Sequence, residues 1–188
     1  MIGNNLTTIP LQTFFVSREI SKCPLISDII KLSKKIDELG LIDNNDYCIS
    51  LAYGKRILIN AKNVNVESMN HQDIIEIVDY DPLKNIILAI GIKDPSIETP
   101  VHWLIHHARD DVNAIIQLNG EKVAKKLSKN LLITEKECLS GTLKLAKQVL
   151  KTLRSSKKIV IKNRGGLFVG ISLKEAEELV LKTYGVYK

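Results

Sequence analysis

Histidine is the residue type in this chain whose spacing most directly suggests chemistry. The sequence contains four histidines, His71, His102, His106 and His107. His102 and His106 are four residues apart in a segment with helical periodicity, so their rings would share one helix face, a spacing found in metal sites. A metal site also needs a third ligand, and no third ligand is close to this pair in the sequence. We therefore favour the alternative that these histidines lie at the surface or support other side chains.

The three cysteines argue against two other kinds of site. Cys23, Cys48 and Cys138 are odd in number, widely spaced and never arranged as Cys-x-x-Cys. Neither a disulfide framework nor a cysteine zinc cluster is expected from this pattern. The N-terminal residues show no basic leader followed by a continuous apolar segment, so we expect no secretory signal. A cytoplasmic location is the resulting expectation.

Length and composition fit an average globular protein. The chain has 188 residues, of which 45% are hydrophobic and 26% charged, and its mean hydropathy is +0.02. We expect a single domain over residues 1–188 and no membrane span, because no apolar run approaches the roughly 20 residues that a span needs.

The positive net charge raises the question of a polyanionic partner. The formal net charge is +6, which could favour nucleic acid or a small anion. The lysines are scattered along helix-like segments with few aromatic residues among them, which is typical of solvated helix faces. Nucleic-acid binding is therefore the weakest functional hypothesis, and a small anionic ligand is retained.

The first half of the chain predicts a helix followed by strands. Apolar residues recur at helical spacing over Pro24–Leu39, and Gly40 is placed to end that helix. Four β-prone runs separated by short turns follow, namely Tyr47–Ala52, Arg56–Asn60, Ile74–Tyr80 and Asn85–Ile92. Consecutive strands joined by short turns predict a largely antiparallel sheet.

The second half mixes helices and strands. A helix is predicted over Glu98–Arg109, with Ser96 available as its cap. Ser172 and Glu175 have capping-box spacing at the start of a last helix that runs to about Tyr184. The remaining predictions are strands at 112–118, 158–162 and 167–171, helices at 120–127 and 141–153, and a turn at 163–166. The fold class is therefore α/β, a layered domain with a central, mostly antiparallel sheet flanked by helices.

Three segments carry residue orders that resemble one known family. Asp94-Pro95-Ser96-Ile97-Glu98-Thr99-Pro100-Val101-His102 is similar to Pro-Ser-Ser-Glu-x-x-x-His, and residues 108–116 (ARDDVNAII) are similar to Arg-Pro-Asp-x-Asn-Ala-Val-Val. Gly141-Thr142 opens a segment similar to Gly-Thr-x-x-Leu-Ala. Residues 159–176 are similar to Leu-Leu-x-Asn-His-Gly followed by Gly-x-Ser-Leu-x-x-Ala, except at the histidine. Together these motifs resemble the class II aldolase/adducin family over about residues 25–188.

This resemblance implies a metal site whose ligands are missing here. In the family's enzymes a His-x-His pair and a third histidine hold zinc, which polarises a carbonyl and stabilises an enediolate. The aligned residues in this chain are Gln117, Asn119 and Arg164. Amides are poor zinc ligands and a guanidinium stays protonated, so we expect no metal and no other cofactor. We expect Arg164 to pair with Glu98, which matches the family's catalytic acid/base, or otherwise to point into solvent.

The phosphate loop of the family is also altered. Its Ser-Gly or Thr-Gly dipeptide aligns with Lys62-Asn63, and losing the glycine removes the close backbone approach that a phosphate uses. Lys62 could still attract an anion as a point charge. The cleft is expected to contain Ser96, His102, Gln117, Asn119, Arg164, Lys62 and Asn63 around Glu98.

Two functions of different classes follow from the resemblance. The favoured one is a metal-free binding or structural module, as in adducin, which is the family's non-enzymatic member. The other is a lyase or isomerase acting on a sugar, a sugar phosphate or a related carbonyl compound through Glu98 and Arg164. Family resemblance also implies a homo-oligomer, commonly a tetramer.

Overall fold

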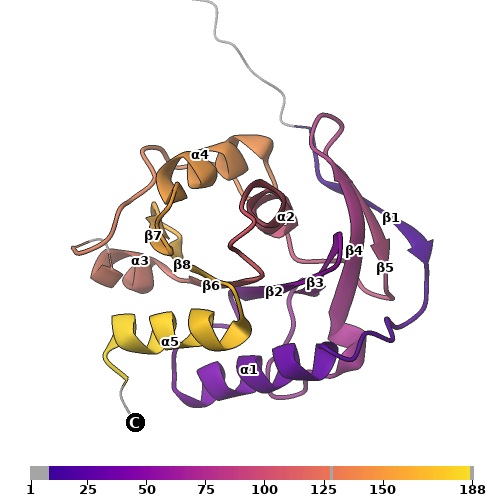
Figure 1. Ribbon diagram of the computed structural model, residues 1–188, viewed down its shortest axis with the longest axis horizontal. Helices are drawn as coiled ribbons and strands as arrows, with labels where there is room; N and C mark the ends of the chain where they lie inside the picture. The colour runs from indigo at the N-terminus through magenta and orange to yellow at the C-terminus, as the bar shows by residue number, and fades with distance from the viewer. Residues whose placement is uncertain (1–8, 128, 187–188) are drawn as a thin grey trace, which may run out of the picture.

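The computed structural model describes residues 9–127 and 129–186. In this part of the chain one eight-stranded sheet, in the order β1-β5-β4-β3-β2-β6-β8-β7, runs through the molecule with helices on both faces (Figure 1). The strands are β1 (Gln12–Ser17), β2 (Tyr47–Tyr53), β3 (Arg56–Asn60), β4 (Ile74–Asp81), β5 (Ile86–Ile90), β6 (Ala114–Asn119), β7 (Lys158–Ile161) and β8 (Gly165–Gly170). All neighbouring strands except one pair are antiparallel, which confirms the predicted fold class.

The exception is a strand that the sequence reasoning missed. β1 pairs in parallel with β5 at the edge of the sheet, with Phe14 opposite Leu88. Phe14 and Val16 are exposed while Phe15 between them is partly buried. Because apolar side chains stand on both faces of β1, the alternation that usually reveals a half-buried strand is absent.

The helices lie in two groups, one on each face of the sheet (Figure 1). They are α1 (Ile26–Glu38), α2 (Thr99–Ala108), α3 (Glu121–Leu127), α4 (Leu143–Leu153) and α5 (Leu173–Tyr184), and η1 (His71–Asp73) is a short 3₁₀ helix. α1 and α5 pack on one face, where α1 buries Ile26, Ile29, Leu32 and Ile36 at helical spacing. α2 and α4 pack together on the other face and share a second apolar core with β6, β7 and β8.

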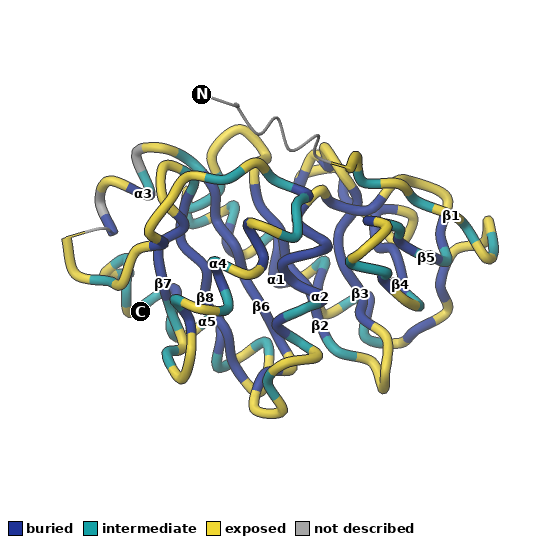
Figure 2. Tube along the Cα trace, turned by 90° about the horizontal axis from the view of Figure 1, so that it is seen from above, coloured by how far each residue is buried: buried dark blue, intermediate teal, exposed yellow. Residues whose placement is uncertain are grey.

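The most completely buried segments are strands of the sheet and not helices. Figure 2 shows the strands of the middle of the sheet as buried, whereas the connecting loops are exposed. β6 and β8 are buried along their whole length. Since both faces of these central strands are covered, side chains at their ends are held in fixed positions, and the polar site described below is built there.

Three local predictions need correction. The β7–β8 turn is shorter than predicted, because β8 already begins at Gly165. Only glycine fits at this position, since a Cβ atom would lie 2.0 Å from the Leu118 carbonyl oxygen. The N-cap residue of α2 is Glu98 and not Ser96, although the Ser96 hydroxyl accepts a hydrogen bond from the Glu98 N–H at 3.3 Å. At α5, Ser172 caps Glu175 N–H as predicted, but the Glu175 carboxylate returns to the N–H of Ile171, one residue before the cap.

None of the helices in the described part of the chain combines the length and apolar character needed to cross a bilayer.

Candidate functional site

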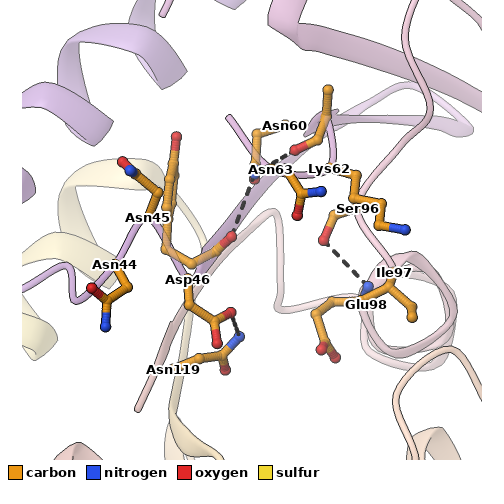
Figure 3. Close-up of a pocket in the computed structure, with 12 residues that line it drawn as sticks. Asn44, Asn45, Asp46, Asn60, Lys62, Asn63, Ser96, Ile97, Glu98 and Asn119 are labelled. Carbon is orange, nitrogen blue, oxygen red and sulfur yellow. Dashed lines mark hydrogen bonds between the residues drawn. The ribbon is translucent and has the colours of Figure 1, made fainter. Parts of the chain in front are cut away.

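A polar pocket of about 410 Å³ lies where β2, β3 and β6 meet the start of α2 (Figure 3). Its walls come from three loops, from the first residue of β2 and from the last residues of β3 and β6. The lining residues are Asn44, Asn45, Asp46, Tyr47, Asn60, Ala61, Lys62, Asn63, Ser96, Ile97, Glu98 and Asn119. Five of these residues that come from the predicted set, Lys62, Asn63, Ser96, Glu98 and Asn119, are thus brought together by the fold.

Asn60 ties the floor of the pocket to its neighbours. Its side-chain Oδ1 accepts from Ile49 N–H at 2.7 Å, and its Nδ2 donates to the carbonyl oxygens of Tyr47 and Ala61. Its own carbonyl accepts from Ser96 N–H at 3.1 Å. This buried side chain, which the sequence analysis did not select, therefore joins β2, β3 and the segment that leads into α2.

Asparagines also shape the rim of the pocket. Asn44, Asn45 and Asn63 have φ of 50°, 56° and 56°, a left-handed conformation that asparagine tolerates better than most residues. Asn45 Oδ1 accepts from Val66 N–H at 3.1 Å, which fixes the loop before β2 against the loop after β3. Successive asparagines before a predicted strand are the sequence signal for such loops.

Arg164 and Glu98 form the expected ion pair. The Arg164 Nε and Nη2 atoms lie 2.9 Å and 2.5 Å from Glu98 Oε1. Glu98 is only 1% exposed, and its other oxygen, Oε2, is buried without a hydrogen-bond partner among the described residues. One carboxylate oxygen therefore takes both guanidinium contacts, while the second oxygen of the same group is buried without a partner among the described residues.

Gln117 and Asn119 form a hydrogen-bonded chain that reaches the pocket. Gln117 Nε2 donates to Asn119 Oδ1 at 2.9 Å, and Asn119 Nδ2 donates to Asp46 Oδ1 at 2.7 Å. An ionised carboxylate only accepts, so Asp46 fixes the orientation of both amides. Gln117 Oε1 is consequently the inner end of the chain, and it has no hydrogen-bond partner among the described residues.

The two histidines of α2 meet at a serine. His106 Nδ1 lies 3.3 Å from the Val112 carbonyl oxygen, which can only accept, so Nδ1 carries the proton. The Ser50 hydroxyl then donates to His106 Nε2 at 2.8 Å and accepts from His102 Nδ1 at 2.7 Å. His102 Nε2 is left as a buried lone pair, without a hydrogen-bond partner in the described part of the chain.

Burial keeps both histidines neutral. It lowers the pKa of His102 to about 3 and that of His106 to about 4, and the Gln117 side chain, which lies beside His102, only partly opposes the shift of the His102 pKa. The two neutral rings of α2 both bond the Ser50 hydroxyl of β2, and these contacts hold α2 against β2. This arrangement agrees with the supporting role that we favoured and does not direct the two rings at a common ion.

The predicted site therefore separates into two layers. Gln117 and His102 are fully buried behind the pocket wall, and neither lines the pocket. Arg164 reaches Glu98 from the β7–β8 turn without lining the pocket itself. Within the described residues no group of three or more His, Cys, Asp or Glu side chains has a metal-binding arrangement.

Comparisons with known proteins identify similar sequences and folds. Residues 27–119 match the family model described as Class II Aldolase and Adducin N-terminal domain. The sequence matches none of the curated proteins. An L-fuculose 1-phosphate aldolase structure superposes with a TM-score of 0.75 at 18% identity, covering 88% of this chain and 84% of that chain.

Two further structures show the same fold. The L-fuculose-1-phosphate aldolase from Thermus thermophilus gives a TM-score of 0.66 at 18% identity and covers 86% of this chain and 90% of its own. The sugar-phosphate aldolase from Thermotoga maritima gives 0.60 at 13% identity and covers 87% and 96%. At such low identity these superpositions establish the fold and carry no information on substrate.

Proposed function

Because this chain belongs to the class II aldolase/adducin family, we propose that it is a metal-free member whose pocket binds a small molecule without catalysing the family's carbon-carbon bond cleavage. The observation that carries this proposal is the ion pair between Arg164 and the buried Glu98. A side chain with a fixed positive charge stands where the resemblance would place a zinc ligand. The Glu98 carboxylate, which would act beside the metal, is paired with the Arg164 guanidinium.

The donor set at this position does not fit a zinc ion. Gln117 and Asn119 use their amide groups to bond each other and Asp46. Amide oxygens are weak zinc ligands compared with imidazole, and a guanidinium repels a dication. Placing a metal here would require breaking the amide chain and the ion pair together.

Loss of the metal also removes the means to stabilise a carbanion. Proton transfer by a lone carboxylate contributes only part of the rate of an enolising enzyme, because the developing oxyanion must be stabilised as well. In this site the group that could stabilise the oxyanion is the Arg164 guanidinium. Two of its nitrogens already contact Glu98 Oε1. These contacts support a binding role over lyase activity.

One observation favours the alternative, a metal-free lyase or isomerase. Glu98 Oε2 has no partner among the described residues and belongs to a residue that lines the pocket. A free carboxylate oxygen beside a guanidinium could in principle move a proton while Arg164 holds an oxyanion. This alternative predicts activity that depends on both Glu98 and Arg164.

Metal content, ligand binding and turnover separate these functions. The purified protein is analysed for zinc by mass spectrometry, its ligands are sought by a thermal-shift library screen confirmed by NMR shifts of the pocket asparagines, and retro-aldol and isomerase activity is tested on sugars and sugar phosphates. We expect substoichiometric zinc, pocket binding and no turnover. Stoichiometric zinc would refute the metal-free assignment.

Variants decide between the binding module and the enzyme. Glu98→Gln is compared with Glu137→Gln. The Glu137 carboxylate lies on the segment before α4 and accepts a hydrogen bond from Asn163, and neither residue lines the pocket. Turnover that disappears in Glu98→Gln and persists in Glu137→Gln would establish the enzyme. Absence of binding by any compound class would remove the binding function.

Three broader features belong to the same proposal. We propose that residues 1–188 form one domain, that the protein is cytoplasmic, and that it assembles as a homo-oligomer, a tetramer by family resemblance. Light scattering coupled to size-exclusion chromatography measures the last of these directly.

A further inference from the structure

We propose that the pocket selects an uncharged, hydroxyl-rich molecule, a polyol or sugar, over phosphate esters and carboxylates. This inference rests on the proposed binding function and specifies its ligand class. It also revises the small anionic ligand expected from the sequence, because the interior of the pocket presents hydrogen-bond acceptors where an anion would need donors.

Two carboxylates face the interior from opposite walls. Figure 3 shows the Asp46 and Glu98 carboxylates on either side of the pocket, with Asn63 and Ser96 on the side of Glu98. Glu98 Oε2 is buried and lacks a partner among the described residues, and Asp46 uses only Oδ1, for Asn119. Ionised carboxylates only accept hydrogen bonds, so a ligand that reaches these oxygens must bring donors to them.

A phosphate ester or carboxylate fails this requirement. At neutral pH both groups are anionic and present mainly acceptor oxygens, which Asp46 and Glu98 would repel. Leaving the buried Glu98 oxygen unpaired also carries a desolvation cost that a hydroxyl donor removes. The hydroxyl groups of a polyol can supply a donor to each carboxylate in turn.

The cations near the pocket do not offset this repulsion. Arg164 is committed to Glu98 through two nitrogens. Lys62 is the remaining cation among the lining residues, and Figure 3 places its ammonium group beyond Ser96, away from Asp46. Lys62 also borders two neighbouring hollows on that side. The Lys62 ammonium group therefore lies at the rim, on the side of the pocket away from Asp46.

The asparagines complete the match to hydroxyl groups. The Asn44 and Asn63 side chains make no hydrogen bond to the described residues, and Asn45 uses only its oxygen. Each free amide offers donors and an acceptor, as each hydroxyl does. The pocket volume of about 410 Å³ is within the range of roughly 300–1,000 Å³ typical of small-molecule sites.

The test compares matched charged and uncharged ligands on matched variants. Isothermal titration calorimetry measures ribitol, xylitol and D-ribose against ribitol 5-phosphate and ribonate, with wild type, Asp46→Asn, Lys62→Gln and the control Asp43→Asn. Asp46→Asn keeps an acceptor for Asn119 and converts the unpaired oxygen into a donor. Asp43 lies in the same loop, and its side chain does not line the pocket.

We expect at least one uncharged compound to bind at least tenfold more tightly than its charged counterpart. Asp46→Asn should weaken that binding by about tenfold, the loss of a hydrogen bond to a charged group, and should narrow the preference over the phosphate ester. Asp43→Asn should leave it within about twofold, because Asp43 is not among the lining residues. Lys62→Gln removes the cation at the rim, so it should weaken binding of the phosphate ester more than binding of the polyol.

Other results would overturn the inference. Tighter binding of ribitol 5-phosphate that depends on Lys62 would show that the site selects anions, and the binding function would stand with a different ligand class. No binding by any uncharged compound, while other compound classes bind in the library screen, would have the same consequence. Only a failure of all classes would reach the proposed function itself.

Discussion

Replacing Arg164 by methionine tests how the buried carboxylate is held. The substitution keeps the aliphatic part of the side chain and removes the two nitrogens that lie 2.9 Å and 2.5 Å from Glu98 Oε1. Glu98 would then be a charged group with almost no exposure and no ion-pair partner. A buried pair that loses one member typically destabilises a protein by about 3–5 kcal/mol.

The structure places the expected value near the lower end of that range. The Arg164 side chain is 27% exposed, so water can partly replace it, whereas the Glu98 side chain is 2% exposed. We expect the free energy of unfolding to fall by about 3 kcal/mol. With a urea m-value of about 2–3 kcal/mol/M, the midpoint should fall by about 1–1.5 M.

A double-mutant cycle assigns the loss to the stranded charge. Glu98→Gln combined with Arg164→Met removes the charge together with its partner, so the double variant should be at least about 1 kcal/mol more stable than Arg164→Met alone. Arg154→Met is the control, because Arg154 is an exposed residue that bonds the Lys151 carbonyl after α4.

Urea unfolding followed by circular dichroism measures wild type, the two single variants Arg164→Met and Glu98→Gln, the double variant and the Arg154→Met control. The reasoning is refuted if Arg164→Met lies within about 0.5 kcal/mol of wild type, the range of ordinary surface changes. It is also refuted if the double variant is no more stable than the single one. Either result would mean that Glu98 is hydrated and that Arg164 does not occupy the role of a buried counter-charge.

Two further predictions concern the histidines and one strand. The lowered pKa values of His102 and His106, about 3 and about 4, mean that the unfolded chain takes up these protons first as pH falls. The contribution of the two neutral rings to the free energy of unfolding is complete above about pH 6.5. It is lost as pH falls toward 4, by up to about 1.4 kcal/mol per pH unit for each ring. Imidazole NMR signals of either ring that titrate near pH 6.5 in the folded protein would contradict this. Gly165→Ala should destabilise the protein by about 3 kcal/mol or more, because the added Cβ meets the Leu118 carbonyl oxygen between β6 and β8; a urea midpoint equal to wild type would disprove the close approach.

The local pattern of this chain was sufficient for most elements and for the character of the site. Helical spacing in 24–39 and the short turns between strands predicted α1 and the two hairpins within a residue or two. The resemblance, together with the residue types of Gln117, Asn119 and Arg164, led us to propose that this position binds no zinc. For Arg164 the sequence left two alternatives, pairing with Glu98 or exposure to solvent, and the structure shows the pair between residues 66 positions apart.

Tertiary structure decided which side chains meet. Ser50 joins His102 to His106, and Asp46 lies against Asn119, because β2 pairs with β6 in a register that places Tyr47 opposite Leu118. That register also puts Cys48 opposite Gln117, and burial raises the pKa of the Cys48 thiol, so it stays protonated. No periodicity within either strand specifies these partners.

The sequence by itself thus predicted most of the elements and the fixed positive charge of Arg164, because hydrophobic spacing and side-chain type are local properties. Only the folded chain decided that Gln117 and His102 lie behind the wall while Asp46 and Asn63 face the pocket. Strand order, register and the direction of each side chain result from packing the whole sheet between its helices. The acceptor-rich interior that distinguishes this pocket is a consequence of that packing.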